Sequence, residues 1–218
     1  MTGQKPLVSG LYAITEARLM PEPVFLVQAE AALRGGARIL QYRDKGDVVA
    51  EAPRRRRQAG ALRELCAQYN ALFVVNDDPL LAQAVAAPAL HVGAEDARLA
   101  ALRAQFGRAI LVGVSCYGSV RQAQEAAALG ADYVAFGSFF ASPSKPQAPV
   151  VSVDVLTAAR AVIDLPIVAI GGITEANGGA LIAAGADALA VISGVFGADD
   201  VEGAARRFTA LFSNRKEG

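Results

Sequence analysis

The sequence predicts a closed (β/α)₈ barrel, the TIM-barrel architecture, from three observations. Eight short apolar runs recur along the chain, each ends in small or charged residues, and stretches long enough for a helix separate them. Apolar runs alternating with helical segments are typical of parallel strands buried on both faces. Eight such units in 218 residues fit one barrel, in which the chemistry lies where the strands end. We therefore expect one catalytic domain over residues 1–218.

The predicted strands are the apolar runs themselves. Their shortness and their bounding turn residues distinguish them from buried helices. They read LYAIT (11–15), RILQYR (38–43), LFVVND (72–77), ALHVG (89–93), ILVGVS (110–115), DYVAFG (132–137), PIVAIGG (166–172) and ALAVIS (188–193).

Helices are expected between these runs, and polar residues stand where their N-caps would lie. Ser119, Ser152, Thr174 and Asp199 are the candidates, because a short polar side chain there accepts a first-turn backbone hydrogen bond. The expected helices span about 22–34, 50–69, 79–86, 97–105, 119–129, 152–163, 174–183 and 199–213.

A weak internal echo supports a repeated architecture. Three segments share a helix end, a glycine stop and a small-residue turn into an apolar strand: AALRGGARILQ, AALGADYVAFG and IAAGADALAVIS. Glycine at a helix C-terminus takes a left-handed conformation without steric penalty. The echo indicates duplicated β/α units.

Charge and hydropathy exclude several partners. The chain has 21 lysine and arginine residues and 21 aspartate and glutamate residues, so it has no overall positive charge that would attract nucleic acid. No segment approaches ~18 uninterrupted apolar residues, so no membrane span is expected. The start MTGQKPLVSG lacks a secretory signal pattern, which makes a cytoplasmic location the default. The run Arg54–Arg57 is interpreted as a solvated helix face, with an anion-contacting patch beside the barrel mouth as the alternative.

Cysteine and histidine usage argues against two other site classes. Cys66 and Cys116 cannot form a disulfide framework of the secreted kind, and with His91 as the sole histidine a Cys/His zinc site is not expected. Cys66 lies in a helical pattern and is assigned to packing. Cys116 follows the fifth strand and is a candidate to face the site.

The end of the second strand, Gln41-Tyr42-Arg43-Asp44-Lys45, is a candidate substrate-binding segment. Side chains alternate along a strand, so Gln41, Arg43 and Lys45 can all point into the barrel mouth. An amide and two cations suit a polar heterocycle that carries a phosphate. The alternative is a charged surface turn.

Carboxylates follow the third and fourth strands. Asn76-Asp77-Asp78 ends the third, and Asp96 lies three residues beyond Gly93. Oxygen ligands without histidines suit Mg²⁺, which binds through one or two carboxylates plus phosphate oxygens. An Asx-turn at Asp77 and a first-turn helix charge at Asp96 are the alternatives. Because the two loops are neighbours in a barrel, we predict that Asp77 and Asp96 hold Mg²⁺.

Hydroxyls, glycines and one lysine supply two anion-binding regions. Segment 138–150 resists a helix or strand assignment, and long loops in compact domains are usually functional or disordered. Its core is Ser142-Pro143-Ser144-Lys145, and Ser115 ends the fifth strand. Gly171-Gly172 and Ile192-Ser193 end strands seven and eight, after which this fold frequently binds phosphate.

Two anion sites facing each other would hold two phosphorylated substrates, with a metal near one of them. A Mg²⁺-bound diphosphate is a good leaving group because the ion takes up developing charge. No nucleophile or base for a covalent mechanism is evident. Catalysis by positioning and charge stabilisation is therefore expected.

With these residues in this order, the chain resembles the thiamine phosphate synthase family over nearly all its length. The matching pieces are LYAIT, GGARILQYRDK, VVND, HVGAED, GVS, GADYVAFG with the SPSK loop, IVAIGGI and AVIS. Each is weak alone, but their order and spacing together are specific.

The resemblance implies a transferase that joins aminomethylpyrimidine diphosphate to thiazole phosphate and releases pyrophosphate by a dissociative mechanism. It implies that Mg²⁺ is held by Asp77 and Asp96. Arg43, Lys45, Ser115 and Lys145 become the candidate catalytic residues. The implied substrate contacts are Gln41, Arg43, Lys45, Asn76 and Ser115 for the pyrimidine diphosphate, Ser142 and Ser144 for the thiazole, Lys145 for the diphosphate, and Gly172, Ile192 and Ser193 for the thiazole phosphate.

Four places depart from the family pattern. Asp78 stands where arginine is common, Ala94 where glutamine is frequent, and Cys116-Tyr117 replaces Thr-His. Ser142 and Ser144 replace threonines and keep the hydroxyls. Asp78 adds negative charge near a diphosphate unless it faces solvent or assists the metal.

Two rival functions stay open at this point. One is the thiazole tautomerase branch of the fold, which needs a proton-transfer group where this chain has Tyr117. The other is a barrel that binds phosphorylated ligands without turnover. The sequence leaves the oligomeric state open, a homo-oligomer included.

Overall fold

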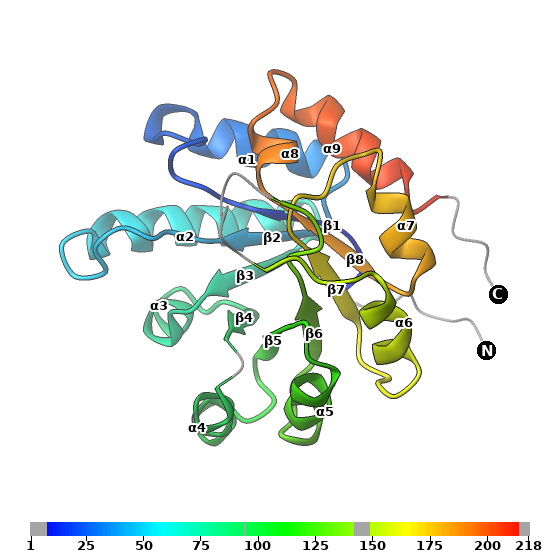
Figure 1. The fold of residues 1–218 in the computed structure, drawn as a ribbon. Helices are drawn as coiled ribbons and strands as arrows, with labels where there is room; N and C mark the ends of the chain where they lie inside the picture. Colours follow the sequence, from blue (N-terminus) through cyan, green and yellow to red (C-terminus); the bar gives the residue numbers. More distant parts are fainter. Residues whose placement is uncertain (1–7, 94, 142–148, 214–218) are drawn as a thin grey trace.

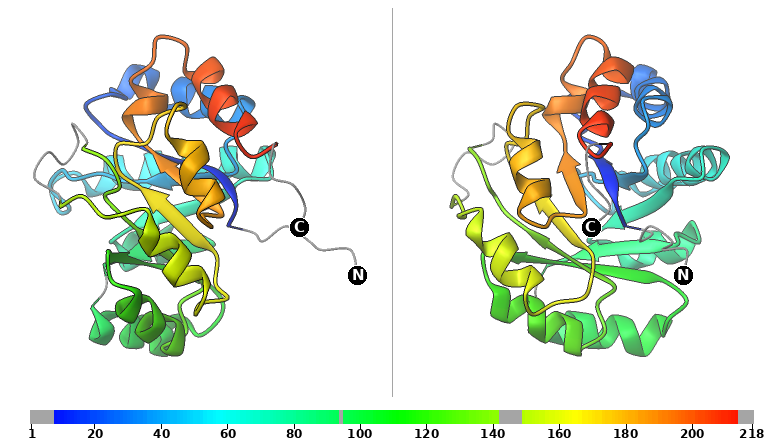
Figure 2. Two further views of the ribbon diagram at one scale, coloured as in Figure 1. Left: turned by 45° about the vertical axis from the view of Figure 1, so that its right-hand side comes forward. Right: turned by 90° about the vertical axis from the view of Figure 1, so that its right-hand side faces the viewer.

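A computed structural model shows eight parallel strands closed into a barrel, with the helices in an outer ring (Figure 1). It describes residues 8–93, 95–141 and 149–213. Figure 2 shows the same arrangement from the side, with the helices packed outside the strands. The predicted fold class is confirmed.

Each strand pairs with its sequence neighbours, and the last strand pairs with the first. Register is continuous across that closure, where Leu11 lies opposite Leu189 and Tyr12 opposite Ala190. The strands are β1 (Gly10–Ile14), β2 (Ile39–Tyr42), β3 (Leu72–Asn76), β4 (Ala89–Val92), β5 (Leu111–Tyr117), β6 (Tyr133–Phe136), β7 (Ile167–Ile170) and β8 (Ala188–Val191).

Every expected helix overlaps a helix of the structure, and the first is split by a 3-10 turn at its start. In the described part of the chain no helix is both long and apolar enough to cross a bilayer. The helical elements are η1 (Glu22–Val24), α1 (Phe25–Arg34), α2 (Ala52–Gln68), α3 (Pro79–Ala84), α4 (Asp96–Phe106), α5 (Val120–Ala128), α6 (Asp154–Arg160), α7 (Gly178–Ala183), α8 (Ser193–Phe196) and α9 (Val201–Ala210).

The predicted N-caps are only partly right. Ser119 caps α5 by accepting from the Gln122 backbone N–H at 3.2 Å. The cap of α9 is Asp200 instead of Asp199, because the helix starts one residue later. Ser152 and Thr174 are also wrong, since the residues that follow them form a turn before α6 and α7 begin.

The alternation of side chains along the strands divides the interior into two cores. Tyr12 and Ile14 on β1 point into the barrel, whereas Leu11 and Ala13 pack under the helices. The barrel core also needs room for the ring of Tyr133. A Cβ atom on Gly113 would lie 1.9 Å from Cζ of that ring, so a residue without a side chain is required there.

Two equivalent ion pairs lie at the N-terminal end of the barrel and account for two of the three segments of the sequence echo. Asp132 precedes β6, pairs with Arg103 of α4, and accepts from the Val112 backbone N–H at 2.7 Å. Asp187 precedes β8, pairs with Arg160 of α6, and accepts from the Ile167 N–H at 2.9 Å. In both copies a Gly-Ala-Asp turn leads from a helix into the next strand, and its aspartate binds the preceding strand and the helix before that strand.

We expect Asp187→Ala to lower the free energy of unfolding by ~2 kcal/mol, because it leaves a buried backbone N–H and a half-buried guanidinium without their partner. Urea denaturation followed by circular dichroism would measure the change. Asp164→Ala removes an exposed carboxylate and serves as the control. Equal stability of the two variants would contradict the role assigned to the pair.

Candidate functional site

A cavity of ≈ 420 Å³ opens at the C-terminal ends of the strands. Inward-facing strand residues form its floor, and the loops after the strands form its walls. Seven residues predicted from the sequence line it: Gln41, Arg43, Asn76, Ser115, Gly172, Ile192 and Ser193.

Arg43 is held in place at this cavity by the two residues that follow β1. Its Nη1 lies 2.6 Å from Oε2 of Glu16, and both side chains are largely buried. Its backbone N–H donates to Oγ1 of Thr15 at 2.9 Å. The guanidinium therefore meets a ligand in a fixed position, with one carboxylate already compensating its charge.

Tyr42 and Asp44 lie on the outer side of β2 and are not brought into the cavity. The Tyr42 hydroxyl lies 3.1 Å from Oε1 of Gln58 and 3.2 Å from Oδ2 of Asp44. That Asp44 oxygen lies 2.6 Å from Nη2 of Arg54. Desolvation by burial, together with the charge of Asp44, raises the pKa of Tyr42, so it stays a neutral phenol.

Within the arginine run, only Arg56 and Arg57 are fully exposed. Arg54 is half-buried and pairs with Asp44 and Glu51. Arg55 is buried. The interpretation of the run as a solvated face is therefore right for its second half and wrong for its first.

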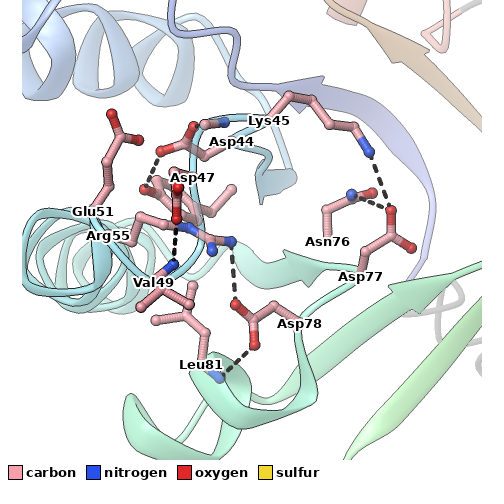
Figure 3. A network of polar contacts seen from close by, with 12 residues as sticks. Asp44, Lys45, Asp47, Val49, Glu51, Arg55, Asn76, Asp77, Asp78 and Leu81 are labelled. Atoms are coloured by element: carbon pink, nitrogen blue, oxygen red, sulfur yellow. Dashed lines mark hydrogen bonds and ion pairs between the residues drawn. The ribbon is translucent and has the colours of Figure 1, made fainter.

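Charged groups cluster where β2 and β3 end, beside the cavity (Figure 3). Oδ2 of Asp77 lies 3.4 Å from Nζ of Lys45 and accepts from Nδ2 of Asn76 at 2.8 Å. Arg98 on α4 approaches Oδ1 of Asp77 to 3.7 Å and donates to its backbone carbonyl. Asp77 itself has a left-handed backbone, with φ at 60°. One accessible carboxylate thus sits between two cations at the rim.

Asp78 turns away from this cluster and has a structural role (Figure 3). Its Oδ1 accepts from the Leu81 backbone N–H at 2.9 Å and caps α3. Its Oδ2 lies 3.1 Å from Nη2 of Arg55, whose side chain is 5% exposed. The extra negative charge that departs from the family pattern is therefore neutralised inside the protein.

Several predicted residues fall outside what the structure describes. They are Ser142, Pro143, Ser144 and Lys145, and also Ala94. Asp96 is the first residue of α4, and its side chain is likewise outside the part of the protein that the structure describes. Among the side chains that are described, no group of three or more His, Cys, Asp or Glu could hold a metal.

Cys116 does not face the cavity. Ser115 points inward, so the next residue of β5 points outward into the core under the helices. Burial raises the pKa of the Cys116 thiol to about 12, and burial does the same for Cys66. Neither thiol is a nucleophile at neutral pH. Tyr117, in contrast, is exposed and lines the cavity.

The sequence analysis did not single out two polar residues of the cavity floor, one tyrosine buried beneath it, and two charged residues near its rim. Tyr12, His91 and Tyr133 form a hydrogen-bonded group inside the barrel. Glu16 and Arg98 pair with predicted residues. The inward register of Tyr12 and His91 follows from the strand period, but a tyrosine or a histidine on a buried strand does not by itself indicate a site.

Comparison with known proteins gives a consistent result. A family model described as thiamine monophosphate synthase matches residues 11–195. A thiamine-phosphate synthase of Acidithiobacillus ferrooxidans is 87% identical over 217 residues, covering 100% of both chains. One from Thioalkalivibrio sulfidiphilus is 47% identical over 97% of this chain and 98% of that protein. The solved structure of a thiamine phosphate pyrophosphorylase from Pyrococcus furiosus has a TM-score of 0.84 and 33% identity, covering 96% of this chain and 97% of that one.

We expect Asp78→Asn to lower the free energy of unfolding by ~3 kcal/mol, because asparagine still caps α3 but leaves the buried Arg55 charge uncompensated. The double variant Arg55→Leu, Asp78→Asn should recover most of this loss. Thermal and urea denaturation would measure both, with the exposed Asp47→Asn as control. A single variant as stable as the control would contradict the assigned pairing.

Proposed function

The chain belongs to the thiamine monophosphate synthase family, and on that premise we propose how its cavity carries out the reaction. The activity is that of a transferase, thiamine-phosphate synthase. We infer that it joins an aminomethylpyrimidine diphosphate to a thiazole phosphate and releases pyrophosphate, with residues 1–218 as one catalytic domain. The observation that carries this is one cavity that combines polar groups with apolar walls and whose rim bears Lys45, Asp77 and Arg98.

The pyrimidine ring is assigned to the side of the cavity formed by β2, β3 and β5. Gln41, Asn76 and Ser115 offer amide and hydroxyl groups there, the types that hydrogen-bond the polar edge of a heterocycle. Arg43 stands beside them, fixed by Glu16. A guanidinium that is already positioned loses little entropy when it binds a diphosphate oxygen.

The diphosphate is assigned to the rim. Lys45 and Arg98 are held near it by Asp77 and can turn to phosphate oxygens when those arrive. The donor set fits Mg²⁺, because the Asp77 carboxylate is 42% exposed and Mg²⁺ needs only one or two protein carboxylates. Asp77 and Asp96 would hold the ion, which supplies charge neutralisation for the departing diphosphate.

The thiazole phosphate is assigned to the turns after β7 and β8. Gly172 has φ at 60°, and a Cβ there would lie 2.4 Å from the Ala141 carbonyl oxygen, so only glycine fits this wall. Ile192 and Ser193 complete it at the end of β8. By the family resemblance, Ser142 and Ser144 contact the thiazole and Lys145 contacts the diphosphate, with Pro143 between them as a further substrate-binding residue.

The order of bond changes is proposed to be dissociative. The C–O bond to the diphosphate breaks first, and the thiazole nitrogen then forms the new C–N bond to the pyrimidine methylene cation. The electron-rich aminopyrimidine spreads this positive charge. Both cysteine thiols are buried and protonated, which agrees with catalysis by positioning and charge stabilisation.

Each rival function has lost support. The departures Asp78 and Ala94 favoured a barrel that only binds ligands; Asp78 is a helix cap paired with Arg55, and Ala94 lies outside the described residues. The tautomerase branch needs a proton-transfer group at the end of β5, where Tyr117 stands, and has no use for the charged rim.

We expect the purified chain to release pyrophosphate from the two substrates, and Asp96→Ala and Lys145→Ala each to lower turnover by ~100-fold or more, because each removes charge stabilisation of the leaving group. A coupled pyrophosphate assay would measure this. Asp164→Ala is the matched surface control, and unchanged melting temperatures would show that the variants fold. Full activity of either variant at saturating Mg²⁺ would count against its assigned role.

We expect excess EDTA to abolish pyrophosphate release and added Mg²⁺ to restore it, because the departing diphosphate then lacks a counter-ion. Initial rates across a Mg²⁺ titration would measure the effect. Asp77→Asn should shift this titration to higher Mg²⁺. A rate that does not change in excess chelator would remove the metal from the scheme.

A further inference from the structure

A continuous hydrogen-bonded chain of side chains crosses the barrel interior beneath the cavity. Nε2 of Gln41 lies 2.7 Å from Oη of Tyr12, which lies 3.0 Å from Oη of Tyr133. That hydroxyl lies 3.1 Å from Nδ1 of His91, whose Nε2 lies 2.9 Å from Oγ of Ser115. Gln41 and Ser115, at the two ends of the chain, line the cavity.

The middle of this hydrogen-bonded chain is buried and closely packed, although Tyr12 and His91 also border the cavity. Tyr12 and Tyr133 are 1% and 0% exposed, and the imidazole of His91 stacks on the Tyr133 ring with centroids 5.5 Å apart. Burial raises the pKa of both phenols far above the ordinary value, so each keeps its hydrogen. Each hydroxyl therefore brings one hydrogen and one accepting oxygen to the chain.

The geometry allows either direction between the two phenols, and the Gln41 amide N–H, which donates to Tyr12, favours one of them. In that direction the Tyr12 hydrogen points to Tyr133. The oxygen of Tyr133 then accepts, and its own hydrogen points to Nδ1 of His91. A neutral imidazole that accepts at Nδ1 carries its hydrogen on Nε2 and donates to Ser115.

We propose that Tyr12, Tyr133 and His91 are positioning residues that fix the hydrogen-bonding polarity of the cavity floor. With the chain directed this way, Gln41 turns its carbonyl oxygen to the ligand and Ser115 turns its hydroxyl hydrogen to it. The floor then selects a heteroaromatic edge with an N–H donor facing Gln41 and an acceptor nitrogen facing Ser115. An aminopyrimidine has such an edge, whereas its oxo analogue, with a carbonyl and a ring N–H, reverses both groups; this assignment of the ligand rests on the proposed function.

The tautomer of His91 tests the direction without any substrate. The polypeptide contains a single histidine, so ¹⁵N-histidine labelling of the untagged protein gives one pair of ring-nitrogen resonances. We expect shifts typical of a protonated Nε2 and an unprotonated Nδ1 at neutral pH. A hydrogen on Nδ1, or on both nitrogens, would overturn the proposal, and this measurement does not depend on any variant folding.

Substrate discrimination tests the consequence for the ligand. In Tyr133→Phe the Tyr12 hydrogen loses its acceptor and can turn to Gln41, whose amide then flips to receive it. We expect the wild-type preference for the aminopyrimidine diphosphate over its oxo analogue, measured as kcat/KM, to fall by ~10-fold, with the KM for thiazole phosphate unchanged. Tyr69→Phe is the matched control, because it removes a hydroxyl that donates to Glu30 far from the cavity.

The possible outcomes distinguish a failure of the positioning role from a failure of the proposed function. Wild-type turnover with the same preference in Tyr133→Phe would overturn the positioning role alone. A wild-type chain that releases no pyrophosphate from either diphosphate would overturn the proposed function, and the ligand assignment with it.

Discussion

The alternation of side chains along closed, parallel strands is the constraint on which this site depends. In a barrel with no free edge, every second residue must face the interior and the others must face the helices. On β2 and the residues after it, this sends Gln41 and Arg43 to the cavity and Tyr42 and Asp44 to the opposite side. On β5 it sends Ser115 inward and Cys116 outward. The chemistry available to the site is therefore selected by register before any loop is considered.

Charge at the mouth is organised in local pairs, which explains how a neutral chain can present a cationic site. Arg43 is matched by Glu16, Lys45 and Arg98 by Asp77, and Arg55 by Asp78. The pairs differ in exposure, and that difference separates their roles. Asp78 and Arg55 are buried and hold the start of α3, whereas Lys45 and Asp77 are exposed enough to exchange partners when an anion and a cation arrive.

The fold could be predicted because its signals are local: apolar runs, their spacing and the turns between them. Gln41, Arg43 and Asn76 were predictable for the same reason, as polar residues at strand ends. The role of Asp78 was not, because its partner Arg55 lies on the preceding helix within a run that reads as a solvated face. The chain of Tyr12, His91 and Tyr133 was hidden as well, since each belongs to a different strand and only the closed barrel brings them together.

The paired clamps of Arg103 with Asp132 and Arg160 with Asp187 lie at the end of the barrel remote from the cavity. The two pairs differ in their distance from the ligand chemistry, because Asp132 directly precedes Tyr133 and, in addition to burial, its negative charge helps to raise the pKa of that phenol. The Arg160–Asp187 pair is therefore the better place to alter robustness to heat and denaturant separately from ligand selectivity.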